Sequence, residues 1–400
     1  MPKHTHTLAA ALTAAAVVLL TPQAHAQDVM CNELENPVYI QAGSTVIPLL
    51  TRLGQQLRDS QANPMTLVFV DGRSCSIIDA VANDTPQTIN FNYVPSSQED
   101  PEWTPDTPPR RCIADPEGVS LDLGHSDIFP ESCGIQTPDS LGVFDGPVLP
   151  FVFVTPPASS QVAITAEEAY FAWGFGQAGG VTPWTDESFL FTRPNTSGTK
   201  ITFGAHIGVP AARWKGQALD KTSDVINAVS TSINAEATLG IVGGANYDAN
   251  RDTLKSLAFA GFGQQSAWYP DSNATSFDKR NVRDGHYLLW APAVFMTNVD
   301  DQGEPTDERV DFLLDLLRSQ PTEPQADFDA TGLIVDQGFV PSCAMEVSRQ
   351  GQAGDLSLFT PQGPCGCFFE DRVGADHQCT TCDDDTPCDS GRCIQGFCQE

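Results

Sequence analysis

The chain has 400 residues, and its 51 Asp and Glu against 21 Lys and Arg give a formal net charge of −30. This charge disfavours nucleic acid and anionic membrane surfaces as partners, because polyanions are repelled. Hydrophobic residues make up 40% of the chain, enough for a substantial core, and the length indicates two or three folding units. Twelve cysteines are too many for an ordinary cytosolic enzyme, so they indicate an oxidising compartment or a bound metal.

Residues 1–26 are typical of a secretory signal peptide. A weakly positive start with Lys3 precedes an apolar stretch from Leu8 to Leu20, and Ala24-His25-Ala26 is a small-x-small cleavage pattern. A membrane-spanning helix needs about 20 apolar residues, and this stretch is interrupted before that length. We therefore expect a soluble, periplasmic or secreted protein that does not span a membrane, with a mature chain beginning near Gln27.

The next segments predict alternating strands and helices. Residues 38–42 and 65–70 have strand character, and each is followed by a polar turn and by leucines or isoleucines at helical spacing. Strands separated by helices predict α/β units around a parallel sheet. In such sheets ligands bind at the carboxyl ends of the strands, which is where both turns fall.

An almost continuous apolar run at 145–155 predicts a buried strand that crosses from one lobe to another. We expect helices at 165–175 and 223–235, a strand at 189–192 and a second crossover near 255–290. The chain therefore predicts two α/β lobes with a cleft between them, over residues 27–360.

Three segments depart from this pattern. Residues 96–111 carry four prolines and several acids and predict an exposed insertion. The acidic stretch 300–329 contains an expected helix at 310–317. Residues 361–400 hold seven cysteines and little that could form a core, so we expect a disulfide-stapled tail in preference to a zinc site, with a connectivity that spacing leaves open.

Four hydroxyl-rich or glycine-rich turns follow expected strands. Backbone N–H groups at a helix start, together with nearby hydroxyls, can bind an anion with little formal charge. For any single turn, a serine or threonine that caps its helix is the simpler interpretation. The four turns are Gly43-Ser44-Thr45, Arg73-Ser74-Cys75-Ser76, Ser126-Asp127 and the segment from Arg193 to Thr199.

Taken together and in this order, the turns resemble the periplasmic phosphate-binding proteins of ABC-type importers. The resemblance covers about 38–292 and rests on Ala42 to Thr45, Gly124 to Pro130 and Arg193 to Thr199. It implies the two-lobed type II periplasmic-binding-protein fold, here with a cysteine-rich tail. It also implies inorganic phosphate or a related oxyanion as ligand, importer membrane subunits as partners, and no catalysis, cofactor or metal.

The resemblance also implies the ligand-binding residues. Arg193 would supply a planar fork and the one full positive charge, and hydroxyls and amides would take the remaining lone pairs. At the second turn the alignment prefers Ser74 to Ser76. The implied set is Ser44, Thr45, Ser74, Ser126, Asp127, Arg193, Ser197, Gly198 and Thr199.

Asp127 is the residue of this set that would distinguish phosphate from sulfate. An ionised carboxylate only accepts hydrogen bonds, so it can accept the proton that phosphate carries at neutral pH, whereas sulfate offers none. Such a group discriminates strongly between the two anions. The simpler interpretation of Asp127 is a helix N-cap.

Other functions remain open from the sequence. A secreted phosphate-ester hydrolase could use Ser126 or Ser197 as nucleophile, although no candidate base is adjacent. A surface-retained interaction protein could use the binding fold only to carry the tail. The segment from Asp248 begins like a calcium loop but lacks the required Gly and Glu, and His206 and His286 are isolated.

Overall fold

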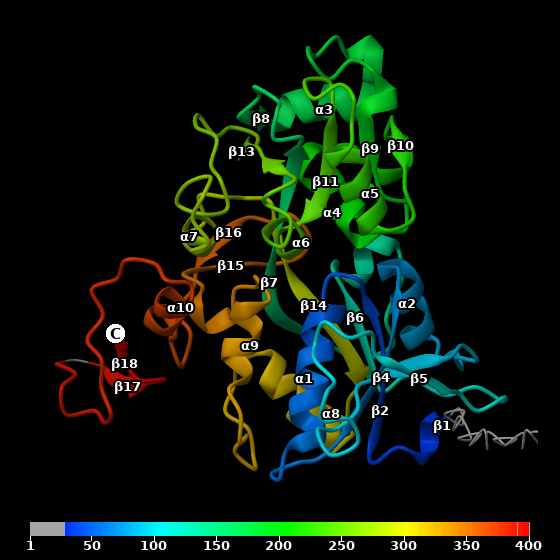
Figure 1. The fold of residues 1–400 in the computed structure, drawn as a ribbon, viewed down its shortest axis with the longest axis vertical. Coiled ribbons are helices and arrows are strands. Elements are labelled where there is room, and N and C mark those ends of the chain that lie inside the picture. The colour runs from blue at the N-terminus through cyan, green and yellow to red at the C-terminus, as the bar shows by residue number, and fades with distance from the viewer. Residues whose placement is uncertain (1–28, 390, 400) are drawn as a thin grey trace, which may run out of the picture.

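The computed structural model describes residues 29–389 and 391–399 of the chain. The expected signal peptide lies outside these residues. Figure 1 shows two lobes stacked along the long axis, with the cysteine-rich tail beside the first lobe.

The first lobe is built mainly from the N-terminal part of the chain. Its elements are β1 Val29–Met30, η1 Cys31–Glu33, β2 Pro37–Gly43, α1 Ile47–Asp59, β3 Thr66–Gly72, α2 Ser74–Ala82, β4 Phe91–Tyr93, β5 Arg110–Ile113, β6 Leu123–Ser126 and η2 Pro130–Cys133.

The long strand β7, Leu141–Thr155, then leads into the second lobe. Its elements are β8 Ala163–Thr165, α3 Ala166–Phe175, η3 Gly176–Gly179, η4 Glu187–Phe189, β9 Leu190–Thr192, α4 Gly198–Ile207, η5 Ala211–Arg213, β10 Gln217–Ala218, α5 Thr222–Ser230, β11 Leu239–Gly243, α6 Gly244–Asp248, β12 Lys255–Ser256, β13 Ala258–Ala260 and α7 Arg280–Arg283.

Strand β14, Trp290–Asn298, returns the chain to the first lobe, where two helices pack near α1 (Figure 1). The remaining elements are α8 Glu308–Leu317, α9 Ala330–Asp336, η6 Ser342–Ala344, β15 Val347–Arg349, β16 Leu356–Leu358, α10 Gly366–Arg372, β17 Arg392–Ile394 and β18 Phe397–Gln399.

One 12-stranded sheet runs through both lobes. In the first lobe β2 lies parallel to β3 and β6, and in the second β9 lies parallel to β10 and β11. The α/β prediction is therefore confirmed, but the sheet is mixed: β7 and β14 run antiparallel to each other and to their neighbours. These are the strands on which the chain passes between the lobes.

Hydrophobic spacing accounts for the helices that were expected. In α1, Leu49, Leu50, Leu53 and Leu57 are all buried. The expected capping threonine of α3 is present, because the Thr165 side chain accepts from Glu168 N and the Glu168 carboxylate accepts from Thr165 N. Helix α5 ends at Ser230, earlier than expected. There the Asn234 and Thr238 side chains bond to nearby backbone groups, which competes with the helix.

The proline-rich segment 96–111 is only partly an exposed insertion. Trp103 is buried in the core, and Arg110 and Arg111 belong to β5, which pairs with β4. Composition could not show these contacts, because they are made with distant residues.

All twelve cysteines form disulfides, which confirms disulfides over zinc. Three lie within the tail, one anchors the tail to η6, and two lie in the first lobe. The pairs are Cys31–Cys112, Cys75–Cys133, Cys343–Cys365, Cys367–Cys379, Cys382–Cys393 and Cys388–Cys398.

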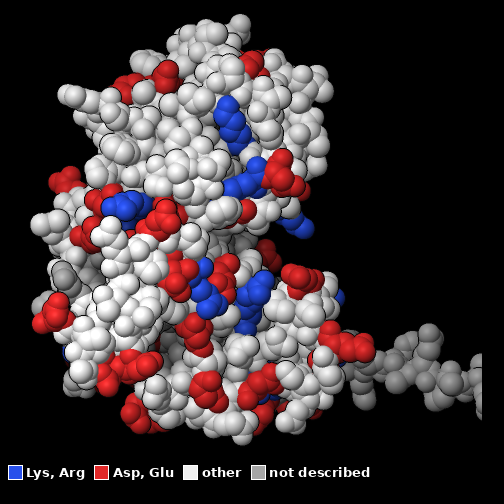
Figure 2. Space-filling view, turned by 60° about the vertical axis from the view of Figure 1, so that its left-hand side comes forward, with Lys and Arg blue, Asp and Glu red and all other residues white. Residues whose placement is uncertain are grey.

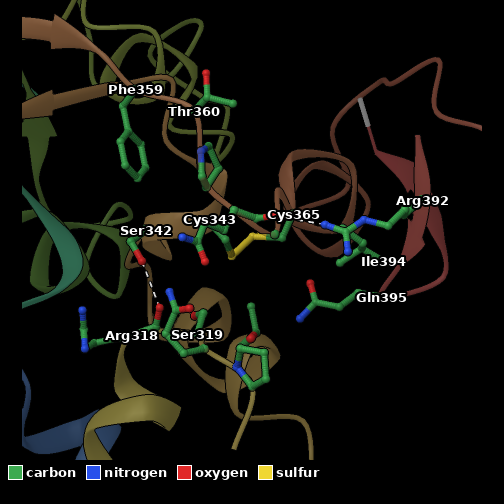
Figure 3. A pocket seen from close by; sticks show the side chains of 16 residues that line it. Arg318, Ser319, Ser342, Cys343, Phe359, Thr360, Cys365, Arg392, Ile394 and Gln395 are labelled. Carbon is green, nitrogen blue, oxygen red and sulfur yellow. Dashed lines mark hydrogen bonds between the residues drawn. A yellow bond between two sulfur atoms is a disulfide. The ribbon is translucent and has the colours of Figure 1, made fainter. Parts of the chain in front are cut away.

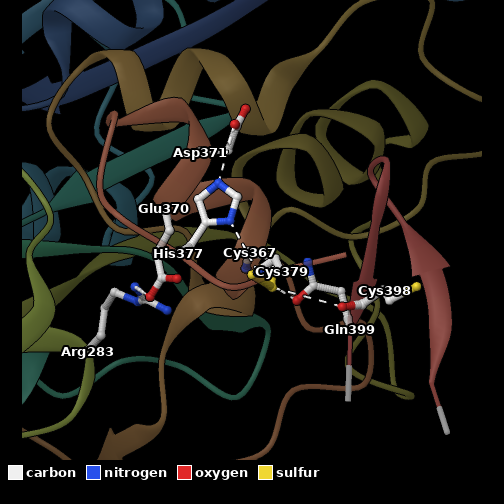
Figure 4. Close-up of a disulfide and its surroundings, with 8 residues drawn as sticks. All are labelled: Arg283, Cys367, Glu370, Asp371, His377, Cys379, Cys398 and Gln399. Carbon is white, nitrogen blue, oxygen red and sulfur yellow. Dashed lines mark hydrogen bonds and ion pairs between the residues drawn. A yellow bond between two sulfur atoms is a disulfide. The ribbon is translucent and has the colours of Figure 1, made fainter. Parts of the chain in front are cut away.

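The start of the tail is also held to the body by a salt bridge. Arg283 Nη1 lies 2.9 Å from Glu370 Oε1, beside the Cys367–Cys379 disulfide (Figure 4). The tail is therefore docked on the body and not free at its origin.

The surface view in Figure 2 shows many acidic side chains over the lower, first lobe and fewer over the upper one, with a notch between the lobes. Among the described helices, none is both long and apolar enough to cross a membrane.

Candidate functional site

The candidate site lies where the two lobes meet, at the carboxyl ends of parallel strands. Strands β2, β3 and β6 of the first lobe lead to Thr45, Ser74 and Asp127, and β9 of the second lobe leads to Arg193. Strand β2 lies between β3 and β6 in the sheet. The chain therefore adds β3 on one side of β2 and later adds β6 on the other side. Such a reversal of strand order is where open α/β sheets place ligands.

In the first lobe, Asp127 is the centre of the contacts. Thr45 Oγ1 donates to Asp127 Oδ1, and Asp127 N donates to Ser74 Oγ over 3.3 Å. All three residues are buried. Ser76, the alternative at the second turn, is exposed, so the structure brings Ser74 to Asp127 and leaves Ser76 outside.

These hydroxyls are not used as helix caps. The N-caps of α1 and α2 are Val46 and Arg73, and neither makes a side-chain capping bond. Asp127 is not an N-cap either, because its carboxylate accepts from Thr45 and only the short η2 follows. The simpler interpretations of Thr45, Ser74 and Asp127 therefore do not apply.

The second lobe presents the start of α4 to the same place. A Cβ built on Gly198 would lie 2.3 Å from Ser74 Oγ and 2.8 Å from Asp127 Cβ, so only glycine permits this approach. Thr199 is buried next to the Asp127 side chain, where it helps to lower the pKa of that carboxyl. Thr202 Oγ1 donates to Asp127 O over 3.4 Å. One aspartate is thus contacted from both lobes.

Arg193 supplies positive charge close to Asp127, although its guanidinium is engaged within its own lobe. It donates to Thr222 Oγ1 and, over 2.8 Å, to Asp220 O, while its buried Nε has no partner among the described residues. Burial lowers the pKa of Arg193, and Asp127 opposes that shift. At the rim, Arg73 Nη2 of the first lobe lies 3.0 Å from Asp220 Oδ1 of the second.

The pKa of Asp127 is raised to about 6, because burial disfavours the carboxylate more than its neighbours favour it. The neighbours that lower this pKa are Thr45, Arg193 and Thr199. Asp127 is therefore ionised at neutral pH and protonated in mild acid.

His125 is a residue of this site that the sequence analysis did not identify. Gly43 N donates to His125 Nδ1 over 3.2 Å, so Nδ1 is unprotonated and the proton of the neutral ring is on Nε2. Nε2 is buried without a hydrogen-bond partner among the described residues and lies 3.9 Å from Asp127 Oδ1. Burial lowers the pKa of His125 to about 3, which keeps the ring neutral. In the sequence, the position of His125 directly before Ser126 is the feature that indicates a place in the site.

Three expected site residues lie differently. Ser44 is exposed. The Ser126 hydroxyl is buried but donates to Ile128 O over 2.7 Å and accepts from Ile128 N, so it stabilises the turn after β6. Ser197 is the buried N-cap of α4, and its side chain makes no capping bond.

Other candidate ligands are used structurally. Asp248, where the calcium-like segment begins, pairs with Arg251 and with Lys279 at 2.9 Å. His206 is half-buried, and its Nε2 lies 3.0 Å from Arg349 Nη1. Within the described part of the chain, the one cluster with metal-ligand spacing is Cys382, Cys388 and Cys398, and all three sulfurs are in disulfides.

Solved structures provide the comparison with known proteins. No protein-family profile matches the chain, and no curated protein sequence matches it. The chain is similar to a structure described as a phosphate ABC transporter substrate-binding protein from Clostridium perfringens, with bound phosphate. The match covers 76% of this chain and 99% of that one, at 13% identity and a TM-score of 0.50.

Two further structures are similar at lower TM-scores. An ABC-type phosphate transport receptor from Vibrio cholerae gives 0.47 at 15% identity, with 76% of this chain and 99% of that one covered. The reduced OxyR regulatory domain from Pseudomonas aeruginosa gives 0.36 at 11% identity, with 66% and 90% covered.

At such identities the similarity establishes the fold. The chain has the two-lobed type II periplasmic-binding-protein fold with a C-terminal cysteine-rich tail, as the sequence predicted.

Proposed function

We propose that this protein is an exported solute-binding protein that captures inorganic phosphate, or a closely related tetrahedral oxyanion, between its lobes without catalysis. The observation that carries the proposal is the convergence on Asp127 of Thr45 and Ser74 from one lobe and Gly198 and Thr199 from the other. These segments are far apart in the chain, and a solvent-exposed turn or helix cap would not require their convergence.

The chemistry of the group fits an anion that still carries a proton. Two threonine hydroxyls, the backbone N–H groups at the start of α4 and the nearby Arg193 are donors, and Asp127 is the one acceptor with a full negative charge. In the proposed complex the donors bind oxyanion oxygens and Asp127 accepts the remaining proton. Fully ionised sulfate would leave Asp127 facing a like charge.

Delivery to an ABC-type importer is part of the proposal, as is a periplasmic or secreted location. The fold, the resemblance of the three turns, the signal-like N-terminus and the disulfides support it. The Clostridium perfringens structure holds phosphate, which supports phosphate as the first ligand to test.

Isothermal titration of the full chain with phosphate, sulfate and molybdate tests the proposal. We expect one phosphate per chain and a preference over sulfate of at least about 100-fold. An absence of saturable binding of all three ions, or a preference for sulfate, would refute it. A chromogenic phosphate ester should be left intact, and turnover that requires Ser197 would instead support the hydrolase.

A further inference from the structure

A small cavity of about 220 Å³ lies beside the strands that connect the lobes, away from the interlobe site. We call it the hinge pocket. Its walls come from β7, β14, the turn after α8, η6 and β15, and its side chains include Asp145, Trp290, Arg318, Met345, Arg349 and Phe359. None of the nine residues expected to bind phosphate lines it.

Arg349 is the unusual group in the hinge pocket. It is only 6% exposed, yet no carboxylate of the described residues lies within salt-bridge distance of its guanidinium. Buried charges are normally paired, because removing an ion from water is costly. Burial lowers the pKa of Arg349 to about 10.

The hydrogen bonds of Arg349 leave donors unused. A guanidinium has five N–H donors, and Arg349 uses one on His206 Nε2 at 3.0 Å, one on Trp290 O at 2.7 Å and one on Leu288 O at 2.8 Å. All three acceptors are uncharged, and Nε has no partner within the described residues. Paired N–H donors on a guanidinium match a carboxylate particularly well.

The other walls fit a small organic body. The guanidinium of Arg349 stacks on the Trp290 ring at 4.3 Å, and Met345, Pro292 and Phe359 add apolar surface. Arg318 contributes a second positive charge, and Asp145, whose pKa is raised by burial, a negative one. The volume is smaller than the ~300–1,000 Å³ of pockets for drug-sized ligands.

The hinge pocket adjoins a larger cavity of about 940 Å³ that reaches the cysteine-rich tail. Arg318, Ser342 and Phe359 line both, and Figure 3 shows them on one side of the larger cavity with Arg392, Ile394 and Gln395 of the tail on the other. The larger cavity therefore offers a route for entry, one wall of which is the tail.

From this arrangement we infer that the hinge pocket is a second ligand site, which binds a small organic carboxylate with an apolar or aromatic body. The carboxylate meets Arg349 and Arg318, and the body packs on Trp290 and Phe359. The site is independent of the proposed phosphate function, because it shares no residue with the interlobe group.

Isothermal titration of the full chain, saturated with phosphate, tests this site with 3-phenylpropionate, L-phenylalanine and 2-phenylethylamine. The first two carry a carboxylate, the last two an ammonium group. We expect one or both acids to bind one per chain, and the amine to bind at least about 10-fold more weakly. Tighter binding of phenylalanine than of phenylpropionate would assign the ammonium group to Asp145. Equal binding of the amine, absence of acid binding, or competition between acid and phosphate for one site would overturn the inference.

Charge variants place the ligand. Arg318 is half-buried at the rim of the hinge pocket, and Arg318→Glu should weaken binding of the acid at least about 10-fold. Arg392→Glu is the matched control, because Arg392 lines only the larger cavity, and it should leave acid affinity unchanged. Arg349→Gln keeps donors but removes the charge, and should abolish binding while near-UV circular dichroism stays native. Equal effects of the two Glu variants would overturn the assignment even if Arg349→Gln fails to fold.

Discussion

Gly198 of the second lobe touches Ser74 of the first: a Cβ on Gly198 would lie only 2.3 Å from Ser74 Oγ. The contact requires the lobes to be closed and explains why a glycine begins α4. A substitution at Gly198 therefore tests lobe closure and leaves the side chains that would donate hydrogen bonds to the ligand unchanged.

Gly198→Ala should weaken phosphate binding by about 10- to 100-fold, since overpacking of this size costs roughly 1–3 kcal/mol. Titration measures the affinity, and thermal unfolding checks that the lobes still fold. Gly174→Ala is the matched control, because a Cβ on this α3 glycine meets Val209 at an ordinary 3.4 Å. If both variants bind phosphate as the native chain does, closure at Gly198 is not needed for binding.

Asp127→Asn should reduce the discrimination between phosphate and sulfate. The amide removes the charge that repels sulfate, so sulfate affinity should rise by about 10-fold or more while phosphate affinity falls. Parallel titrations with the two anions measure the ratio. An unchanged ratio would remove Asp127 from the explanation of selectivity.

The same substitution should stabilise the ligand-free protein at neutral pH. Because burial raises the pKa of Asp127 to about 6, the folded state keeps a proton that the unfolded state releases near pH 4. Stability from this residue therefore falls as pH rises from about 4 to 6. The amide that replaces the carboxylate does not titrate, so the variant should gain about 1–3 kcal/mol above that window and little below it.

Urea unfolding across that pH range measures the gain. Asp301→Asn, at an exposed position, is the control. A constant difference between Asp127→Asn and the native chain at all pH values would contradict the prediction.

His125 should make the protein sensitive to acid. Burial lowers its pKa to about 3, so below about pH 6.5 this histidine takes up a proton in the unfolded chain but stays neutral in the folded chain. The stability present above 6.5 is then lost progressively as the pH falls toward 3. His125→Gln can still accept from Gly43 N and should lose less stability on acidification.

Denaturant titrations at neutral and acidic pH compare the two chains. His286→Gln is the control, because His286 is exposed. Some acid sensitivity should remain in His125→Gln, since burial lowers the pKa of His206 to about 3 as well. Equal slopes for His125→Gln and His286→Gln would contradict this role.

The Cys75–Cys133 disulfide should position the site as well as stabilise the lobe. Cys75 follows Ser74, and Cys133 lies six residues after Asp127, so the bond joins the turns whose Ser74 Oγ and Asp127 N are hydrogen bonded. Replacing both cysteines by serine should cost about 4 kcal/mol for a separation of 58 residues and should weaken phosphate binding.

Replacing Cys388 and Cys398 by serine is the matched control, since this disulfide lies wholly in the tail. It should leave the affinity for phosphate unchanged. Equal phosphate affinities in the two double variants would show that Cys75–Cys133 has no positioning role.

Local signals predicted most of what the structure contains near the site. Leucine spacing located α1, and strand-like runs located β2, β3 and β7. The turns with Thr45, Asp127 and Thr199 were expected from their residues and order. These predictions succeeded because they depend on side chains close in sequence.

Contacts between distant residues could not be predicted in the same way. The ring of His125 accepts a hydrogen bond from Gly43, which lies 82 residues earlier. Of the adjacent residues Ser44 and Thr45, Thr45 is buried at Asp127 and Ser44 is exposed, and their sequence does not indicate which of the two turns inward. Disulfide spacing fits many pairings equally well. The buried position of Trp103 depends on core packing that its proline-rich surroundings do not indicate.

The attachment of the tail has a mechanical consequence. Cys365 is bonded to Cys343, and two residues before η6 Val340 exchanges backbone hydrogen bonds with Val148 of β7. A pull on the C-terminus is thus transmitted, through one covalent link and one backbone pair, to the strand that both lobes share. If the protein is tethered by this end, tension on the tether reaches the pivot between the lobes before it reaches the outer helices of the second lobe.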